Sequence, residues 1–444
     1  MSDLLRIGAS GITAYRSALS VIADNVANAE TPGYARRDVA LRETTAASSG
    51  PLYRASVTGG GVAAASVTRA WDAFKASDAR DAGSDAASAE TRAQWLGAVE
   101  TALPDGDNGI PARIGSFFAA ATRLAADPGG TLARSTTLSA LGDAAAAIRS
   151  GAAGLARVQQ GIAADATATV ASANTNLASL GQVNRSIARA AEGSTAKAAL
   201  ADERDRLLGD LAGQIGIDAT ISANGTVAVS LAGAPDTPLV SGSGSATIGL
   251  TLGEDGRVAL DVGGARLTAT GGKLAGLADA AAATADATAT LNTLAVDFAG
   301  QINGWQAQGR TPAGAAGAPL LTVGATAATL VVSTSDPSAI AAASAEGSAN
   351  GNLATLTDLR GAAGAEARMS ALINLNAQAL ATTSAQAGAA GTRRDAAAAA
   401  RDDVAGVDLD REAAELIRFQ QAYDGAAKVI QVARETLQSI LQLF

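Results

Sequence analysis

Two apolar helical stripes, one near each end of the chain, constrain its fold more than any other feature of the sequence. Near the amino terminus, apolar or small residues recur every three or four positions: Leu5, Gly8, Ile12, Tyr15, Leu19, Ile22, Val26 and Ala29. The carboxyl-terminal stripe has the same spacing and comprises Leu416, Phe419, Tyr423, Ala426, Ile430, Ala433, Leu437, Ile440 and Phe444. This spacing predicts helices with one apolar face, which gain most of their stability from a partner surface. We expect coiled-coil-like helices that pair with each other and with neighbouring copies, and that are mobile in the free monomer.

The ordinary alternative is that each stripe faces the core of a single globular domain. The positions of the stripes favour assembly, because they lie at opposite ends of the chain and each is bounded by a break. Thr31-Pro32-Gly33 ends the first helix, since proline disfavours helical geometry at the preceding residue. The acidic run Asp408-Leu409-Asp410 suits the positive end of the second helix.

Between the stripes the pattern is mostly helical, with one strand-rich insert. Helices are expected over 71–103, 114–126, 131–211, 273–308 and 352–404, and short extended pieces over 34–67 and at 330–333. Alternating Val and Thr residues with Asn224-Gly225 as a turn predict strands at 225–231, 246–252 and 257–262. The expected fold is mainly α with an inserted small β domain, in an elongated multi-domain protein. The expected division is 1–67 with 405–444 as assembly core, 68–212 with 273–404 as helical body, and 213–272 as the inserted β domain.

Composition supports this interpretation and excludes several functions. Aromatic residues are 3% of a chain that is 48% hydrophobic, so the apolar content is mainly alanine and small aliphatic residues, which suit close helix packing. The chain has no cysteine and no histidine, which excludes disulfides, thiolate ligands and histidine-based catalysis. A net charge of −9 argues against a nucleic-acid partner. No apolar run is long enough to span a membrane and no cleaved signal is evident, so the cytoplasm is expected unless another export route operates.

Three motifs are better explained by ordinary structure than by a binding site. Asp105, Asp107 and Asn108 suggest a calcium loop, but Ser116 occupies the twelfth position, where a glutamate is needed. Gly271-Gly272-Lys273 lacks the glycine spacing and the following Ser or Thr of a phosphate loop. The run from Asp202 to Arg206 is expected to be a solvated helix face, with these two residues paired at i,i+4. No metal, cofactor or catalytic residue is therefore predicted.

The terminal segments resemble the flagellar rod, hook and hook-associated axial proteins. The resemblance begins at Ser10-Gly11-Ile12-Thr13-Ala14 and continues through the motif residues Asn25, Asn28, Thr31, Pro32, Gly33 and Tyr34. The following Ala35-Arg36-Arg37 is similar to the form typical of the first hook-associated protein family, with substitutions at two positions. The carboxyl end is a closer match, over Gly406 to Asp410 and Leu416 to Tyr423, which include Arg418, Gln420 and Gln421. Interior matches are Phe117-Phe118, Leu200 to Leu208 and Asp336 to Ala341.

That resemblance implies a structural subunit that joins the hook to the filament and polymerises through its paired terminal helices. The implied partners are other copies in a ring, the hook protein, the second hook-associated protein, and a cytoplasmic export chaperone that binds the carboxyl-terminal helix. Export would proceed without a cleaved signal peptide, and the location would be extracellular. An amphipathic helix bound in a groove fits the chaperone contact.

Two rival functions stay open. One is another axial subunit, such as a hook, distal-rod or second junction protein, although the carboxyl-terminal match and the long helical middle argue against hook and rod. The other is a filament-borne enzyme, which without histidine would be restricted to a Ser-Lys or carboxylate mechanism.

Overall fold

A computed structural model describes residues 2–45 and 59–442 of the chain. These residues form two compact units. The first unit comprises Met1–Ser84, Ala173–Thr247 and Gly391–Phe444, and the second comprises Asp85–Ser172 and Ile248–Ala390. Three long helices have residues in both units: α2 (Ala73–Ala102), α4 (Thr131–Arg189) and α8 (Ala365–Ala405).

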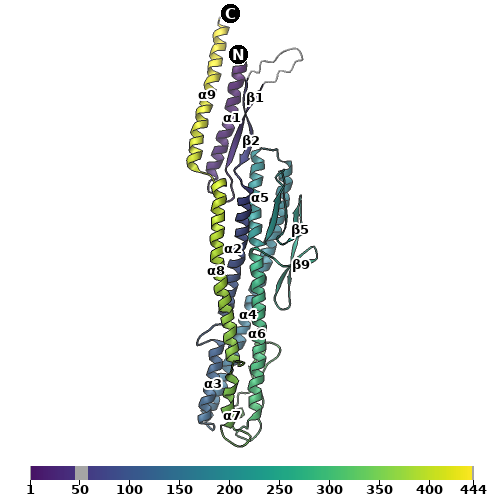
Figure 1. Cartoon of the computed structure of the whole chain (residues 1–444), viewed down its shortest axis with the longest axis vertical. Helices are drawn as coiled ribbons and strands as arrows, with labels where there is room; N and C mark the ends of the chain where they lie inside the picture. Colours follow the sequence, from purple (N-terminus) through teal and green to yellow (C-terminus); the bar gives the residue numbers. More distant parts are fainter. Residues whose placement is uncertain (1, 46–58, 443–444) are drawn as a thin grey trace. The chain divides into compact units, whose positions relative to one another are not determined.

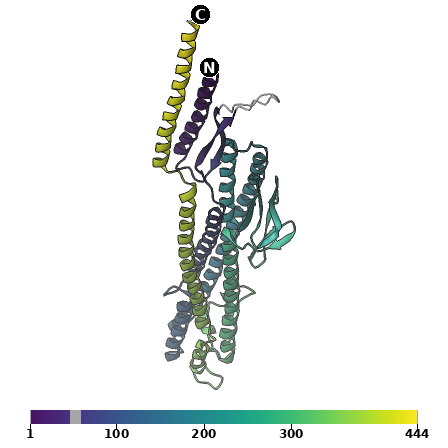
Figure 2. The ribbon, with the colours of Figure 1, turned by 45° about the horizontal axis from the view of Figure 1, so that its top comes forward.

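The two terminal helices lie in the first unit. α1 (Ser2–Ala27) is followed by an antiparallel hairpin of β1 (Arg37–Thr45) and β2 (Gly59–Arg69). The hairpin accounts for the described part of the extended segment expected over 34–67, of which residues 46–58 lie outside the described residues. α9 (Leu409–Leu441) runs beside α1 in the opposite direction, so that both helices have their chain ends on the same side (Figures 1 and 2).

A four-stranded sheet completes the first unit. After α4, a turn at Gly193 with φ +68° leads into α5 (Thr195–Gln214), whose first turn is capped by the Ser194 hydroxyl. The sheet order is β3-β4-β5-β6, with bounds Ile217–Ile221, Val227–Leu231, Ala234–Ser241 and Gly244–Ser245. The buried Asn184 of α4 holds the sheet, because its amide donates to the carbonyls of Val227 and Gly242, each at 2.7 Å.

The second unit is a helical body with an apolar core. Its other main helices are α3 (Ile110–Ala126), α6 (Gly272–Gln308) and α7 (Gly351–Thr355). The largest buried side chains include Phe117 and Phe298. At Gly276 a Cβ atom would lie 2.3 Å from the Ser88 carbonyl oxygen, so only glycine allows this close approach of α6 to α2.

Buried amides of α6 and α7 fix the long segment between these two helices. Gln306 donates to the Ala339 carbonyl and accepts from the Ala341 N–H, and Asn352 donates to the Ala341 carbonyl at 2.7 Å. These bonds satisfy backbone groups that lie outside regular structure. The short elements here are β10 (Leu321–Thr322), η1 (Ala327–Thr329), β11 (Val331–Val332), η2 (Pro337–Ala339) and η3 (Leu356–Arg360).

The strand-rich segment is distributed between the two units. β7 (Ile248–Leu252), β8 (Val258–Val262) and β9 (Ala265–Leu267) form a separate three-stranded sheet in the second unit. This sheet is tied to its own unit by the Arg257–Asp286 ion pair at 2.5 Å and by a bond from Gln159 to the Asp255 carbonyl. The fold class, mainly α with a small β insert, is confirmed. Strands β3, β5, β6, β9 and β10 are additional to those expected from the sequence.

Candidate functional site

The terminal helices α1 and α9 contact each other closely through small residues. An added Cβ at Gly8 would lie 2.6 Å from Ile430 Cγ1, and one at Gly11 would lie 3.0 Å from Ala426 Cβ. Further along the two helices, the rings of Tyr15 and Phe419 pack together, with 6.3 Å between their centroids. Glycines on α1 therefore set the distance between the helices, because a side chain at Gly8 would force the two apart.

The β1–β2 hairpin contacts α1 through a glycine of β2. Gly61 has φ +99°, and an added Cβ there would lie 2.1 Å from the Ser10 hydroxyl oxygen. That hydroxyl donates to the Ile7 carbonyl at 2.8 Å and accepts from the Val62 N–H at 3.2 Å. The hairpin is thereby held along α1.

At the end of the pair, five side chains form what we call the polar collar: Asn25, Tyr34, Arg36, Arg37 and Glu412. Asn25 lies at its centre and is 1% exposed. Its amide nitrogen donates to the Arg37 carbonyl at 2.9 Å and to Glu412 Oε2 at 3.0 Å. Its amide oxygen accepts from the Tyr34 hydroxyl at 2.8 Å and from the Arg37 N–H at 3.0 Å. One asparagine thus joins α1, the turn after it, β1 and α9 with its full hydrogen-bonding capacity.

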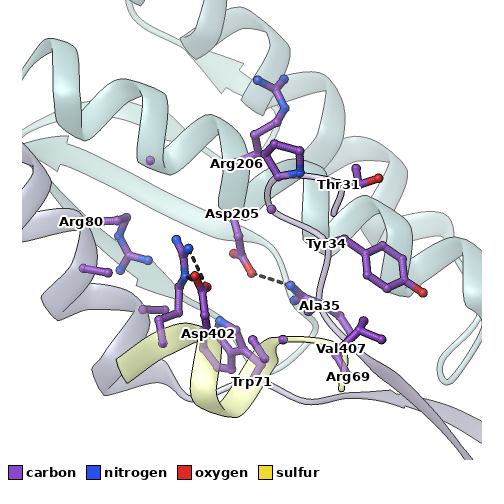
Figure 3. Close-up of a pocket in the computed structure, with 18 of the residues that line it drawn as sticks. Thr31, Tyr34, Ala35, Arg69, Trp71, Arg80, Asp205, Arg206, Asp402 and Val407 are labelled. Atoms are coloured by element: carbon purple, nitrogen blue, oxygen red, sulfur yellow. Dashed lines mark hydrogen bonds and ion pairs between the residues drawn. The ribbon is translucent and has the colours of Figure 1, made fainter. Parts of the chain in front are cut away.

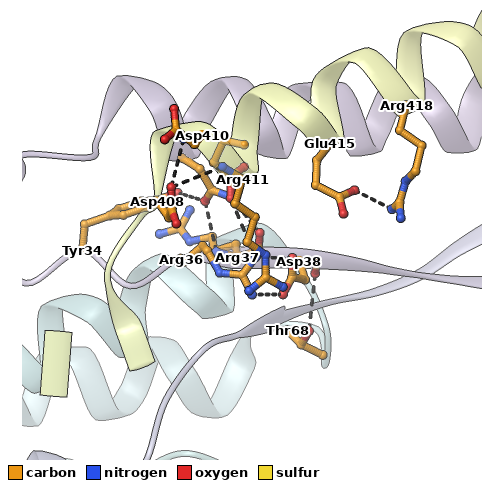
Figure 4. Close-up of polar contacts among 12 residues, drawn as sticks. Tyr34, Arg36, Arg37, Asp38, Thr68, Asp408, Asp410, Arg411, Glu415 and Arg418 are labelled. Carbon is orange, nitrogen blue, oxygen red and sulfur yellow. Dashed lines mark hydrogen bonds and ion pairs between the residues drawn. The ribbon is translucent and has the colours of Figure 1, made fainter. Parts of the chain in front are cut away.

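Glu412 brings α9 into the polar collar and is itself 1% exposed. Its Oε1 lies 3.7 Å from the Arg36 guanidinium, which also pairs with Asp38 through two bonds of 2.9 and 2.5 Å (Figure 4). The first turn of α9 is capped by Asp408, whose carboxylate accepts from the N–H groups of Asp410 and Arg411. A buried carboxylate needs such partners, because desolvation of an unpaired charge costs several kcal/mol.

An ion-pair cluster continues from the polar collar toward α5. Asp202 Oδ2 lies 2.5 Å from the Arg37 guanidinium. Asp202 Oδ1 lies 2.8 Å from Arg69 Nε, but this is an ion pair without a hydrogen bond, because the N–H is not directed at the oxygen. Asp205 pairs with Arg69 at 2.9 Å and with Arg204 at 2.6 Å. Arg204 also donates to the Gly225 carbonyl at 2.6 Å, which ties the cluster to the β3–β4 turn.

The expectation of a solvated helix face at Asp202 to Arg206 is wrong. Asp202 is 9% exposed and pairs with arginines of the hairpin, whereas Arg206 pairs with Glu203 and Asp210 at 2.6 and 2.7 Å. Mixed charges on one helix are compatible with either arrangement, so the sequence pattern could not identify the tertiary partners.

Tyr34 links the turn after α1 to the polar collar and to Arg37 of the ion-pair cluster. Burial, opposed by the nearby Arg37, raises the pKa of Tyr34 to about 12. The Arg37 guanidinium lies over the Tyr34 ring at 4.7 Å from its centroid. The phenol therefore stays protonated and donates to Asn25 over the physiological pH range.

Several predicted motif residues close the turn after α1 without entering the polar collar. Asn28 donates to the Asp24 carbonyl and accepts from the Thr31 hydroxyl, while Gly33 adopts φ +83°. Thr31 and Pro32 are exposed. On α9, Arg418 pairs with Glu415 at 2.5 Å and lies over the Phe419 ring, whereas Gln420 and Gln421 are exposed.

The predicted assembly stripes are only partly covered within one chain. On α1, the stripe residue Gly8 is buried, but beyond it the covered face is shifted by one residue, to Gly11, Ala14 and Ala18. The predicted residues Leu5, Ile12, Tyr15 and Leu19 are half-buried, Ile22 is buried and Val26 is 45% exposed. On α9, Leu416, Phe419, Tyr423, Ile430 and Leu437 are half-buried and Ile440 is 42% exposed, while Phe444 lies outside the described residues.

Arg36, Arg37 and Glu412 are the members of the polar collar that sequence reasoning does not single out as site residues. Asn25 enters it only as part of the motif. A signal was present for Asn25, because it follows Ala14, Ala18 and Val21 at helical spacing and so lies on the covered face. No comparable signal marks Glu412, because its partner lies 387 residues away.

Within residues 2–45 and 59–442, none of the helices is long and apolar enough to cross a membrane. The same residues include no group of three or more acidic, histidine or cysteine side chains placed to hold a metal ion. Lys273, in the glycine-rich motif considered above, is ion-paired with Asp165 at 2.6 Å.

Three segments of the chain match known families. Residues 96–321 match the family described as the flagellar hook-associated protein FlgK helical domain. Residues 5–34 match the flagella basal body rod protein family, and residues 403–443 match the flagellar basal body rod FlgEFG protein C-terminal family. The two terminal matches coincide with α1 and its motif turn and with α9.

Individual proteins similar to this chain are also flagellar hook-associated or hook junction proteins. The chain is 30% identical over 233 residues to flagellar hook-associated protein 1 of Bacillus subtilis, which covers 50% of this chain and 46% of the relative. It is 23% identical over 235 residues to the Salmonella typhimurium protein of that name, covering 52% and 42% of the two chains. These matches span less than half the length of either relative. The solved flagellar hook junction protein FlgK from Burkholderia pseudomallei has a similar fold, with a TM-score of 0.66 at 15% identity, over 74% of this chain and 100% of that one.

Proposed function

Since this chain belongs to the family of the flagellar hook-associated protein FlgK, we propose that it is a structural subunit of the junction between the hook and the filament. The observation that carries the proposal is the antiparallel α1–α9 pair, closed by a polar collar that contains motif residues of the axial proteins. A rigid pair of terminal helices with large apolar residues left half-exposed is suited to pack against further copies.

In this proposal the assembly core comprises residues 1–67 and 405–444. The small residues of α1 and α9 pack within one chain, while the larger ones contact neighbouring subunits. Leu5, Ile12 and Leu19 of α1 are half-buried, and Ile417 and Val432 of α9 are 56% and 58% exposed. Burying such residues between copies is favourable by about 1.5–3 kcal/mol for each side chain that becomes fully covered.

The partners we propose are other copies of this chain in a ring, the hook protein and the second hook-associated protein. Before export, a cytoplasmic chaperone would cover the apolar residues of α9 as a helix bound in a groove. The assembled protein would be extracellular. We propose no enzymatic role, because the chain offers neither histidine nor cysteine for catalysis.

Another axial subunit is the second candidate, since the terminal segments match rod-protein families. The helical-domain match over residues 96–321 favours the junction. Deletion of the protein distinguishes the two roles. Loss of a junction subunit should give cells with intact hooks and filaments shed into the medium, whereas loss of a rod or hook subunit should give cells without hooks.

A further inference from the structure

The first unit contains an open cavity next to the polar collar. It has a volume of about 820 Å³ and is lined by the motif turn after α1, the start of α2, α5 and the end of α8 (Figure 3). Side chains around it include Trp71, Arg80, Arg206 and Asp402. A volume of this size exceeds that of any single side chain, so the cavity has room for a turn of helix from another molecule.

Two hydrogen-bond donors at this cavity have no acceptor among the described residues. The first is the Trp71 indole N–H, which is buried and has no hydrogen-bond partner there. The second is Arg80, which is half-buried and makes no hydrogen bond or ion pair within the part of the chain that the structure describes; in Figure 3 no dashed line joins it to another residue drawn. Burial lowers the pKa of Arg80, and the charges of Asp205 and Asp81 oppose the shift. Unpaired donors of this kind favour a carboxylate ligand.

Three helical glycines leave space in the cavity wall. A Cβ added at Gly83, Gly209 or Gly213 would meet no atom within 4 Å. Glycine inside a helix is less favourable than alanine, and no close packing requires it at these three positions. The glycines therefore keep the cavity wide at the expense of helix stability.

An exposed aromatic residue lies on the other side of α2. Phe74 is 80% exposed, and the Asp72 carboxylate fixes the helix start by accepting from the N–H groups of Phe74 and Lys75 at 2.9 and 3.0 Å. One turn later, Asp78 is exposed and makes no hydrogen bond or ion pair with any described residue. The α2 residues that line the cavity are Ala76, Ala79, Arg80 and Gly83. At about 100° per residue they lie roughly 140–240° around the helix axis from Phe74, on the opposite side of α2.

We propose that the cavity is a docking site for the Phe74–Asp78 turn of a second copy of this chain. The ring of Phe74 would enter the open space above the glycines, and the Asp78 carboxylate would accept from the Arg80 guanidinium. Because cavity and turn lie on opposite sides of one helix, a chain cannot fill its own cavity, and each copy can bind the next in a head-to-tail contact. This inference rests on the proposed function, since it names one contact through which copies would associate.

Photocrosslinking tests the contact directly. Phe74 is replaced with p-benzoylphenylalanine, which retains an aromatic ring, and flagella isolated from irradiated cells are analysed by mass spectrometry. We expect crosslinks from position 74 to peptides of a second copy that line the cavity, in the motif turn or α5. In the same background, Gly209→Leu fills the cavity and should lower the crosslinked product by about tenfold or more. Gly300→Leu is the matched control, because Gly300 is also an exposed helical glycine with open space around it, on α6 and away from the cavity.

The outcomes separate this contact from the proposed function. If the chain is present in flagella and position 74 crosslinks elsewhere or not at all, the docking site is refuted while the junction role stands. If the chain is absent from flagella, the junction role fails, and the purified full chain at high concentration decides the contact by the same crosslinks. Equal crosslinking by the Gly209→Leu and Gly300→Leu variants would also overturn the proposal.

Discussion

The polar collar leads to a sharp prediction for Asn25→Asp. The substitution keeps the shape of the side chain and the oxygen that accepts from Tyr34 and Arg37. It replaces the amide nitrogen, which donates to Glu412 Oε2 at 3.0 Å, with a second carboxylate oxygen. Two charges about 3 Å apart repel by roughly 5–6 kcal/mol at an effective dielectric constant near 20. The variant should therefore lose stability at the junction of α1 and α9.

Protonation limits the size of this loss. Keeping a carboxyl with an ordinary pKa near 3.9 protonated at pH 7 costs about 4 kcal/mol, and the protonated group can again donate to Glu412. The nearby Arg36 further reduces the repulsion. We therefore expect the free energy of opening of α1 and α9 to fall by about 2–4 kcal/mol at pH 7.

The loss should depend on pH with a definite sign. Burial beside Glu412 raises the folded-state pKa of the introduced carboxyl above its unfolded value, because both favour the neutral form. Below about pH 4 the group is protonated in both states and the electrostatic penalty vanishes, whereas the penalty grows as pH rises toward 7.

Hydrogen exchange of the full-length protein, measured on peptides from α1 and α9 at pH 5 and pH 7 and corrected for intrinsic rates, gives the opening free energies. The double variant Asn25→Asp with Glu412→Gln should recover most of the loss, because the new amide on α9 can donate to the carboxylate introduced on α1. Asn28→Asp is the control, since Asn28 bonds only near its own turn and should cost under about 1 kcal/mol. Unchanged exchange in the Asn25→Asp variant at pH 7 would refute the view that Asn25 holds the helices together.

Three further predictions concern the same region. The pKa of Tyr34 is raised to about 12 in the folded protein, from about 10 in the unfolded chain, so the unfolded state releases the phenol proton first. The stability of the protein should therefore fall as pH rises from 10 to 12. The Tyr34→Phe variant should show a smaller fall in melting temperature over that range. Gly61→Ala should destabilise the protein by about 1–3 kcal/mol more than Gly106→Ala in urea unfolding, because both glycines have positive φ but only Gly61 lies against another side chain. Leu437→Asp should leave the circular dichroism spectrum of the purified chain nearly unchanged and block incorporation into flagella, because a charge in a packed seam costs several kcal/mol; normal incorporation would contradict an assembly role for the α9 stripe.

Local signals in the sequence predicted most of the helices. The Thr31-Pro32-Gly33 stop lies just after the end of α1 at Ala27, and Asp408 caps α9 as its acidic character suggested. The break between α4 and α5 at Gly193 was missed as a helix end, because one glycine within a long helical pattern costs too little to mark it. Strand β3, Ile217-Asp218-Ala219-Thr220-Ile221, was missed although Gly216 directly precedes it.

The candidate site was less predictable than the fold. The stripes identified the right two helices and included the contact residues Gly8 and Ala426, but on α1 they took in Ile12, Tyr15 and Leu19 where the covered face follows Gly11, Ala14 and Ala18. Which face of an amphipathic helix is covered depends on the partner, and the sequence of α1 alone does not contain that partner. The same limit applies to Asp202, whose partners Arg37 and Arg69 lie on a distant hairpin.

The bond between Asn25 and Glu412 has a kinetic consequence. It joins residues separated by 387 positions, so its formation closes a very long loop, at an entropic cost of roughly 5 kcal/mol that grows only slowly with length. Contacts of such high sequence separation form late and slowly. A nascent chain that has not yet emerged beyond Glu412 cannot complete the contact, and α1 meanwhile has only the hairpin to pack against. The order of synthesis itself thus delays completion of the first unit until α9 has been made.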